Sequence, residues 1–133
     1  MILLDTHTLI WLDGDNPKLG TTSRRTIARA WSDGKVAVSA ISFWECAMLQ
    51  LRGRVELPGP VNVWRLELLE AGIVELPLNG EIAVIAAQLE MLHKDPADRF
   101  IVATASSHDA ILLTADQRLL AWDNPLKRQN ALA

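Results

Sequence analysis

Four short apolar runs, each followed by a longer segment of helical spacing, constrain the fold of this chain most. The runs are residues 1–5 (MILLD), 36–41 (VAVSAI), 73–78 (IVELPL) and 110–116 (AILLTAD). Uninterrupted apolar runs of this length are typical of strands that are covered on both faces. Because helical segments separate them, we expect parallel strands joined by right-handed crossovers. The sequence therefore predicts an α/β three-layer sandwich around a mostly parallel sheet of four to five strands.

The segments between these runs carry signals for the start and end of helices. The predicted helices span residues 21–34, 42–53, 63–72, 79–92, 95–109 and 117–122. Thr22 or Ser23 is the expected cap of the first helix, and Asp95 caps the fifth. Ser42 and Glu45 have the spacing of a capping box. The last eleven residues, DNPLKRQNALA, offer no convincing strand, so we expect a domain over residues 1–122 and a tail or short edge strand over 123–133.

Composition limits the partners and the compartment. The formal net charge is −3, so a nucleic acid would have to meet a local basic patch or a bound metal rather than a basic surface. The single cysteine, Cys46, excludes an internal disulfide and suits a reducing compartment. No apolar run is long enough to span a membrane, and the N-terminus lacks the basic region of a signal peptide. We therefore expect a cytoplasmic protein without a membrane partner.

Acidic residues follow the predicted strands. Asp5 ends the first strand, Glu45 lies just beyond the second, and Asp116 follows the fourth. The carboxyl ends of parallel strands share one edge of the sheet, where ligands bind, so these three side chains should converge there. Asp98 lies in the first turn of the helix before the fourth strand and is expected at the same edge, although two helices fill that crossover.

Four carboxylates at one edge would repel each other unless a cation joins them. Oxygen ligands favour a hard divalent ion, Mg²⁺ or Mn²⁺. Zinc spacing is absent among the possible nitrogen and sulfur ligands, which are His7, His93, His108 and Cys46. A carboxylate-bound Mg²⁺ is used for phosphodiester hydrolysis, because the metal lowers the pKa of the attacking water and stabilises charge on the phosphate.

Each acid also has a purely structural explanation. Asp5 could begin a turn, Glu45 could complete a capping box, and Asp116 could cap the last helix. Asp98 could favour the positive end of a helix dipole. The coincidence of all four on one edge favours a site.

Two further groups of residues could contact RNA or could have only a structural role. The five tryptophans are expected in the core and at interfaces rather than as platforms for RNA bases. Arg24, Arg25 and Arg29 either form an RNA-binding patch or are solvated charges on a helix surface.

Four segments in this order resemble the PIN-domain ribonucleases, and most closely the VapC-type toxins of type II toxin–antitoxin modules. The segments are LLDTHTLIW, VSAISFWECAM, DPADRFIVATA and LLTADQRL, and the resemblance spans residues 1 to 122. It implies a Mg²⁺-dependent endoribonuclease that hydrolyses RNA through a metal-activated water, with Mn²⁺ as a substitute. The implied catalytic residues are Asp5, Glu45, Asp98 and Asp116, of which Asp5, Asp98 and Asp116 would hold the metal. It also implies a homodimer that a cognate antitoxin inhibits.

Other classes fit less well. A haloacid-dehalogenase-like phosphatase needs a second Asp two residues after the first, where this chain has His7. A receiver domain needs adjacent acids after the first strand and a late lysine. A catalytically silent PIN-like scaffold that binds RNA or protein remains the alternative to the nuclease.

Overall fold

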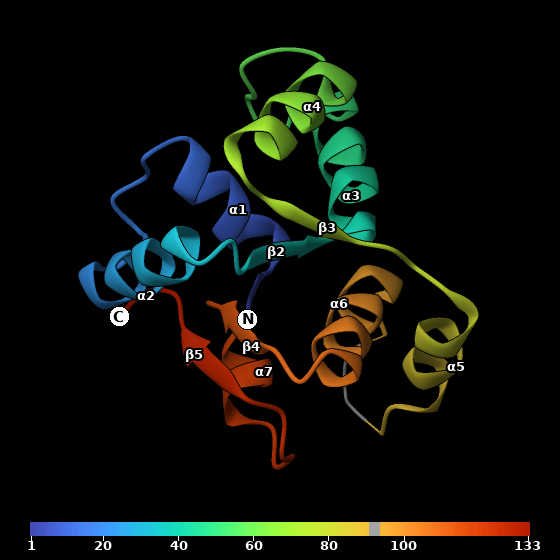
Figure 1. Cartoon of the computed structure of the whole chain (residues 1–133). Helices are drawn as coiled ribbons and strands as arrows, with labels where there is room; N and C mark the ends of the chain where they lie inside the picture. Colours follow the sequence, from blue (N-terminus) through green and yellow to red (C-terminus); the bar gives the residue numbers. More distant parts are fainter. Residues whose placement is uncertain (91–93) are drawn as a thin grey trace.

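A five-stranded parallel sheet runs through the centre of the molecule, between layers of helices (Figure 1). The computed structural model describes residues 1–90 and 94–133. The spatial strand order is β3-β2-β1-β4-β5, and every neighbouring pair is parallel. The strands are β1 (Ile2–Leu4), β2 (Val36–Ser39), β3 (Val74–Leu76), β4 (Ile111–Thr114) and β5 (Arg128–Asn130). The predicted α/β class and parallel sheet are therefore confirmed.

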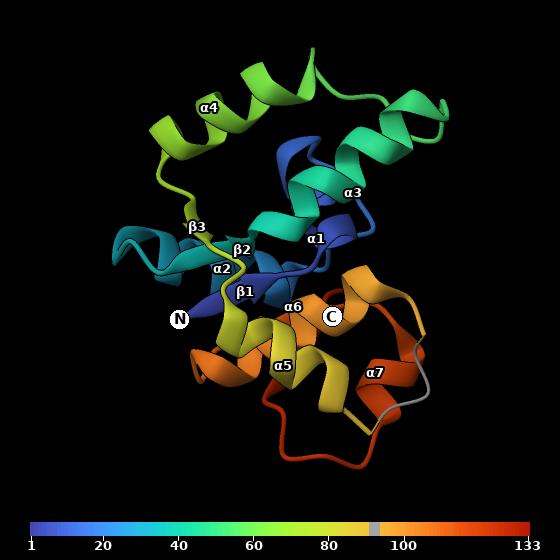
Figure 2. The same ribbon diagram turned by 90° about the vertical axis from the view of Figure 1, so that its right-hand side faces the viewer.

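Seven helices in the described part of the chain cover the two faces of the sheet. They are α1 (Thr6–Asp13), α2 (Thr21–Ser32), α3 (Ala40–Leu51), α4 (Val61–Ala71), α5 (Gly80–Gln88), α6 (Pro96–Ser107) and α7 (Gln117–Ala121). Figure 2 shows α3 and α4 above the sheet and α5 and α6 below it. Among the described residues no helix has the length and apolarity needed to cross a membrane.

Side-chain alternation along β1 divides the core into two layers. Ile2 and Leu4 pack in one cluster with residues of α1, α2, α3 and α4, whereas Leu3 packs in the other with residues of α6 and α7. Successive side chains of a strand point to opposite faces of the sheet. All three residues are buried, because helices cover both faces. A third, small cluster joins α5 to α6.

Several predicted helix boundaries are confirmed, and two predicted caps are wrong. Asp95 caps α6, and its carboxylate accepts a hydrogen bond from the backbone N–H of Ala97. The predicted capping box at Ser42 does not form, because α3 begins earlier, at Ala40, and Ser39 caps it. Helix α2 follows Gly20 and has no side-chain cap, so neither predicted hydroxyl serves there. The helix predicted over residues 79–92 is shorter than expected, because α5 ends at Gln88 with Leu89 in an extended conformation; residues 91–92 of the prediction lie outside the described part.

One helix was not predicted from the sequence, and one strand was left open as either a tail or a short edge strand. Helix α1 is apolar on several sides, with Leu9 buried and Trp11 half-buried, so it lacks the polar face that marks a surface helix. Strand β5 has the polar sequence Arg-Gln-Asn, which is not typical of a strand. It is ordered by its parallel pairing with β4, in which Leu113 lies opposite Gln129. The segment 123–133 therefore contains a short edge strand.

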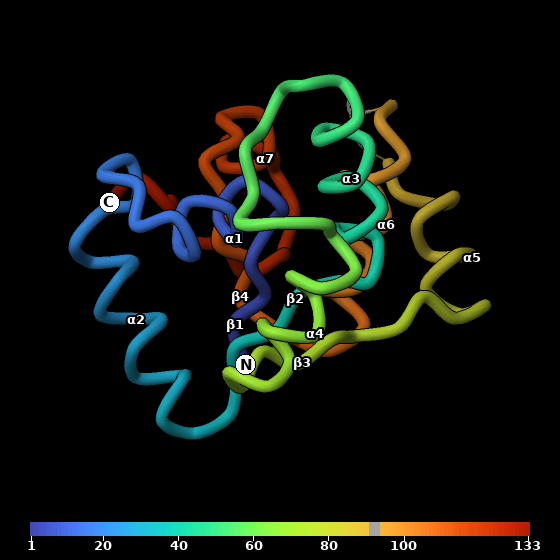
Figure 3. Tube along the Cα trace, turned by 90° about the horizontal axis from the view of Figure 1, so that it is seen from above, coloured from blue at the N-terminus to red at the C-terminus, as the bar shows by residue number. Residues whose placement is uncertain are grey.

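The C-terminal segment closes against the start of α2, as Figures 1 and 3 show. The backbone N–H of Gly20 donates to the carbonyl of Ala131 at 2.9 Å, and that of Ser23 donates to Ala133 at 3.0 Å. A β-carbon added at Gly20 would lie 2.1 Å from the carbonyl carbon of Ala133. Only glycine leaves room for this approach, since the obstacle is backbone.

We predict that Gly20→Ala lowers the free energy of unfolding by about 1–3 kcal/mol, because the C-terminal backbone must move away from α2. Urea denaturation followed by circular dichroism measures the change. Gly59→Ala is the matched control, since nothing lies within 4 Å of a β-carbon built there. Equal stability of the two variants would contradict the close approach.

Candidate active site

A cavity of about 340 Å³ lies at the carboxyl ends of the strands and contains all four predicted acids. Five of the described residues that line it are carboxylates, and its lining consists of Asp5, Thr6, His7, Trp11, Glu45, Asp95, Asp98, Ile101, Ala115, Asp116 and Leu119. These side chains come from α1, α3, α6, α7, the loops after β1 and β4, and the residue that caps α6. The sheet edge that the sequence predicted is thus where the acids lie together.

Asp5 is both the end of β1 and the cap of α1. Its backbone N–H donates to the carbonyl of Leu113 at 3.1 Å, which ties it to the neighbouring strand β4. Its Oδ1 accepts a hydrogen bond from the backbone N–H of Thr8 at 2.8 Å. One carboxylate oxygen is therefore held by the helix start, which fixes the side chain at the cavity wall.

Asp116 is held in a comparable way at the start of α7. Its Oδ1 accepts hydrogen bonds from the backbone N–H groups of Arg118 and Leu119, at 2.9 and 3.4 Å. Its own N–H donates to the buried hydroxyl of Thr114 at 3.1 Å. Asp98 lies in the first turn of α6 and is half-buried. Capping and the helix dipole thus orient these carboxylates toward the positive ends of their helices.

Glu45 lies in the second turn of α3 and forms a hydrogen-bonded network with α1. The hydroxyl of Thr6 donates to its Oε1, and the hydroxyls of Thr6 and Ser42 are 3.0 Å apart. Thr6 has one hydroxyl proton, which goes to the carboxylate, so Ser42 is the donor in the hydroxyl pair. Thr6 and Ser42 are buried, and the network fixes Glu45 relative to Asp5, the residue before Thr6.

Cys46, next to Glu45, plays no part in this chemistry. Burial, with a smaller contribution from the charge of Glu45, raises the pKa of its thiol to about 12. At neutral pH the side chain is therefore a protonated thiol, which is a poor nucleophile and a poor metal ligand. It packs in the core as a small apolar group.

The donor chemistry of the cavity fits a hard divalent cation. Of the described residues that line it, five offer carboxylate oxygens and none is a lysine or arginine. Within residues 1–90 and 94–133, however, no three acidic, histidine or cysteine side chains are gathered tightly enough to hold a metal ion as they stand. A hydrated Mg²⁺ fits such a site, because this ion keeps several waters and needs only one or two direct carboxylates.

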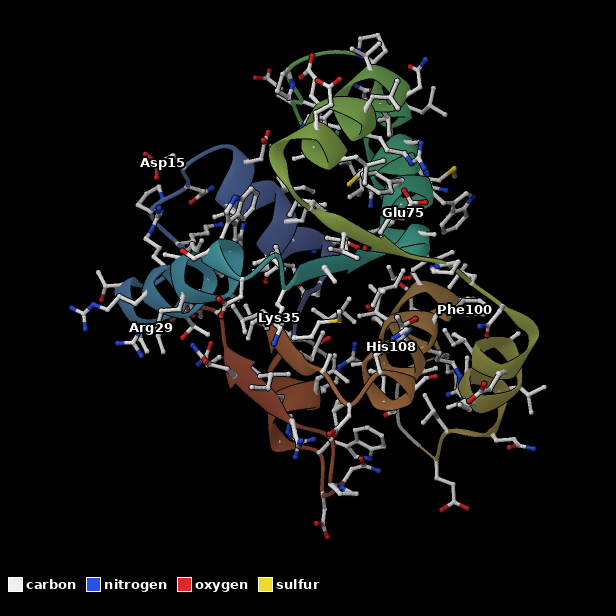
Figure 4. The ribbon with its side chains drawn as sticks, viewed as in Figure 1. Asp15, Arg29, Lys35, Glu75, Phe100 and His108 are labelled. Carbon is white, nitrogen blue, oxygen red and sulfur yellow. The ribbon has the colours of Figure 1, made fainter. Side chains whose placement is uncertain are left out.

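Of the described histidines and the arginines of α2, only His7 lines the cavity. His7 lines the cavity, whereas His108 ends α6 and His93 falls outside the described residues. Arg24 is bound to the loop before α2, through the carbonyls of Leu19 and Asn16. Figure 4 shows Arg29 pointing away from the body of the protein.

Thr6 and Trp11 line the cavity, although neither was predicted as a site residue from the sequence. Thr6 is adjacent to Asp5, but its contact with Glu45 joins residues 39 positions apart. Trp11 was expected in the core or at an interface; it packs against the core cluster, and it also lines the cavity. The one sequence signal for both is that they follow Asp5 on the same short helix.

The chain belongs to the PIN-domain family, whose model matches residues 2–124. Ribonuclease VapC22 of Mycobacterium tuberculosis is 34% identical over 125 residues, which cover 93% of each chain. The resemblance to VapC-type toxins that the four motifs predicted is confirmed.

Solved structures agree on the fold. VapBC2 from Rickettsia felis, bound to a DNA fragment from its promoter, matches with a TM-score of 0.69 at 16% identity over 98% of both chains. FitAcB from Neisseria gonorrhoeae matches with a TM-score of 0.56 at 27% identity, also over 98% of both chains. These likenesses support the PIN architecture.

We predict that Thr6→Val lowers the free energy of unfolding by about 1–3 kcal/mol, because Glu45 and Ser42 lose a buried partner while the side-chain shape is kept. Thermal or urea unfolding measures the loss. Thr6→Ser should retain most of the stability, since it keeps the hydroxyl. Thr22→Val, at an exposed position, is the matched control and should change little. A stable Thr6→Val variant would show that the network contributes nothing to folding.

Proposed function

We propose that this protein is a Mg²⁺-dependent endoribonuclease, the toxin of a toxin–antitoxin pair, which hydrolyses RNA phosphodiester bonds at the acidic cavity. The catalytic residues are Asp5, Glu45, Asp98 and Asp116. The observation that carries the proposal is their convergence on one cavity from four separate segments of the chain. Membership of the PIN-domain family and the identity with Ribonuclease VapC22 support the same chemistry.

Asp5, Asp98 and Asp116 would hold the metal, for which Mn²⁺ can substitute. When bound, the ion supplies Lewis-acid stabilisation of phosphate charge and a lowered pKa of a bound water. The chain's own contribution is orientation: the N–H groups at the starts of α1 and α7 fix Asp5 and Asp116. Glu45 is positioned by Thr6 as an acceptor beside the metal ligands, where it would orient a water or accept its proton.

We assign the nuclease to residues 1–122, and residues 123–133 complete the sheet through β5. The protein would act in the cytoplasm, where its RNA substrate and its antitoxin are made. The net charge of the protein is −3, so it does not attract RNA by its overall charge. The metal and local cations would supply the attraction instead.

The outer surface of α3 and α4 would carry the protein partners. Exposed apolar side chains gather there, at Trp44, Leu51, Val63 and Leu66. A separate apolar cavity of about 250 Å³ lies between α1, α2 and α4 and is lined by Leu9, Leu12, Asp13, Trp31, Leu68, Ala71 and Ile73. We propose that a cognate antitoxin and a second copy of the chain cover these surfaces, because isolated monomers rarely expose such patches.

A catalytically silent PIN-like scaffold is the second candidate. The observation in its favour is that, in the described part of the chain, the carboxylates do not form a compact metal cluster as they stand. The two candidates differ in their response to metal. A nuclease should gain thermal stability on titration with millimolar Mg²⁺, since a ligand that binds the folded state stabilises it. A scaffold should not respond.

We predict that Asp98→Asn lowers the rate of Mg²⁺-dependent RNA cleavage by at least about a hundredfold and weakens the stabilisation by Mg²⁺. The reason is that asparagine keeps the shape of the side chain but removes the anionic oxygen that a metal needs. Cleavage of total RNA, followed on gels at equal protein concentration, measures the loss. Asp33→Asn, outside the cavity at the end of α2, is the matched control. Full activity of Asp98→Asn would overturn the metal assignment.

We predict that Glu45→Gln keeps the melting temperature within a few degrees but loses about two orders of magnitude in cleavage rate. Glutamine can still accept the hydrogen bond from Thr6, so the network survives, whereas the negative charge does not. The melting curve and the cleavage rate of the same sample separate the two roles. Glu67→Gln, exposed on α4, should behave like the unmodified protein. If Glu45→Gln cleaves normally, the carboxylate is structural only.

A further inference from the structure

Trp11 faces the acidic cavity from the second turn of α1. It lines the cavity together with Asp5 and Glu45, and it is half-buried, since part of its ring packs on the core cluster. His7, one turn earlier on α1, meets the indole edge-on, with ring centroids 6.5 Å apart and an interplanar angle of 61°. The lining of the cavity therefore combines carboxylates with aromatic rings.

A cation covers the indole. The Nζ of Lys18 lies 5.8 Å from the centroid of the Trp11 ring, which is within the range of a cation–π interaction. Lys18 is exposed, and in the part of the chain that the structure describes it forms no ion pair. Its ammonium group is therefore available to a ligand that brings negative charge to the ring.

The loop that carries Lys18 is fixed. Arg24 donates to the carbonyl of Leu19 at 3.0 Å and to that of Asn16 at 2.7 Å, and it pairs with Asp15 at 2.7 Å. The side-chain oxygen of Asn16 accepts a hydrogen bond from the backbone N–H of Lys18 at 2.9 Å. The backbone at Lys18 is thus held beside α1 before any ligand arrives, so little ordering would be required on binding.

An aromatic face with a cation beside it matches an unpaired nucleotide. Bases of single-stranded nucleic acids stack on aromatic side chains while cations contact the adjoining phosphates. Packing in the core explains the buried part of the Trp11 ring, but it does not explain the exposure of the ring to the cavity or the cation over it. The position next to the acids suits a nucleotide that adjoins the cleaved bond.

We propose that Trp11 and Lys18 form a subsite for one unpaired nucleotide next to the phosphodiester bond that the acids cleave. The base stacks on the indole and displaces the ammonium group of Lys18, which moves to the phosphate of the same nucleotide. The proposal rests on the ribonuclease function proposed above and adds to it a preference for single-stranded substrate at this position.

The test compares two fluorescein-labelled probes of equal charge: an RNA of eight adenosines, and a chain of eight abasic ribose phosphates. Binding is measured by fluorescence anisotropy in Ca²⁺, and the RNA is checked on a gel after each titration. Trp11→Leu keeps an apolar side chain without a ring, so it should weaken binding of the adenosine RNA about tenfold and binding of the abasic probe less than twofold. Trp11→Phe should stay within about threefold of the unmodified protein on both probes.

Lys18→Gln should weaken both probes by the same factor and reduce the salt dependence of binding, because the phosphates are common to both. Trp122→Leu is the matched control, since Trp122 is also half-buried but packs on the opposite core cluster, and it should leave both affinities unchanged. Melting curves show that each variant is folded.

An equal loss on both probes in Trp11→Leu, or no loss on either, would overturn the subsite. That result together with an inactive Asp98→Asn variant would leave the nuclease standing without the subsite. An active Asp98→Asn variant would instead remove the proposed function, whatever the binding data show.

Discussion

The pairing of β1 with β4 is the constraint on which the site depends. Leu4 lies opposite Leu113 in register, so β1 and β4 end within one residue of each other. Asp5 follows β1 directly, and Asp116 follows β4 by two residues at the same edge. The backbone hydrogen bond from Asp5 to Leu113 fixes this level further. The β1–β2 pairing brings the start of α3, and with it Glu45, to the same edge. The cavity is a consequence of strand register more than of any local sequence.

Structural and chemical roles coincide in these carboxylates. Asp5, Asp95 and Asp116 each cap a helix, and Asp98 lies in a first helical turn. Capping does not compete with a role at a metal, because it engages backbone N–H groups with one oxygen and leaves the carboxylate charged. It also offsets part of the repulsion among the acids, since each helix start carries partial positive charge. The capping explanation and the catalytic one therefore describe the same side chains.

Helix α1 links the two sides of the cavity. Its first residues supply Asp5 as a cap and Thr6 as the partner of Glu45, and its next turn supplies Trp11. The loop that follows brings Lys18 back to the Trp11 ring of the same helix. Arg24 holds the backbone of this loop through the carbonyl of Leu19. One short helix thus connects the acids that would bind metal to the ring that would bind a base.

The sequence by itself determined the α/β class, the four strands β1 to β4 and the sheet edge at which the acids meet. It could do so because an apolar run ending in an acid is a local pattern, and parallel strands place their carboxyl ends together whatever the details. It did not predict α1, which is apolar on several sides. It also could not decide between a tail and an edge strand for residues 123–133, because the polar residues of β5 are ordered only by pairing with β4. It also misplaced the start of α3, because Ser39 and Ser42 are both suitable caps. Only the tertiary structure brought Thr6 to Glu45 and Lys18 to Trp11, since these contacts depend on helix packing and on a loop held by one arginine.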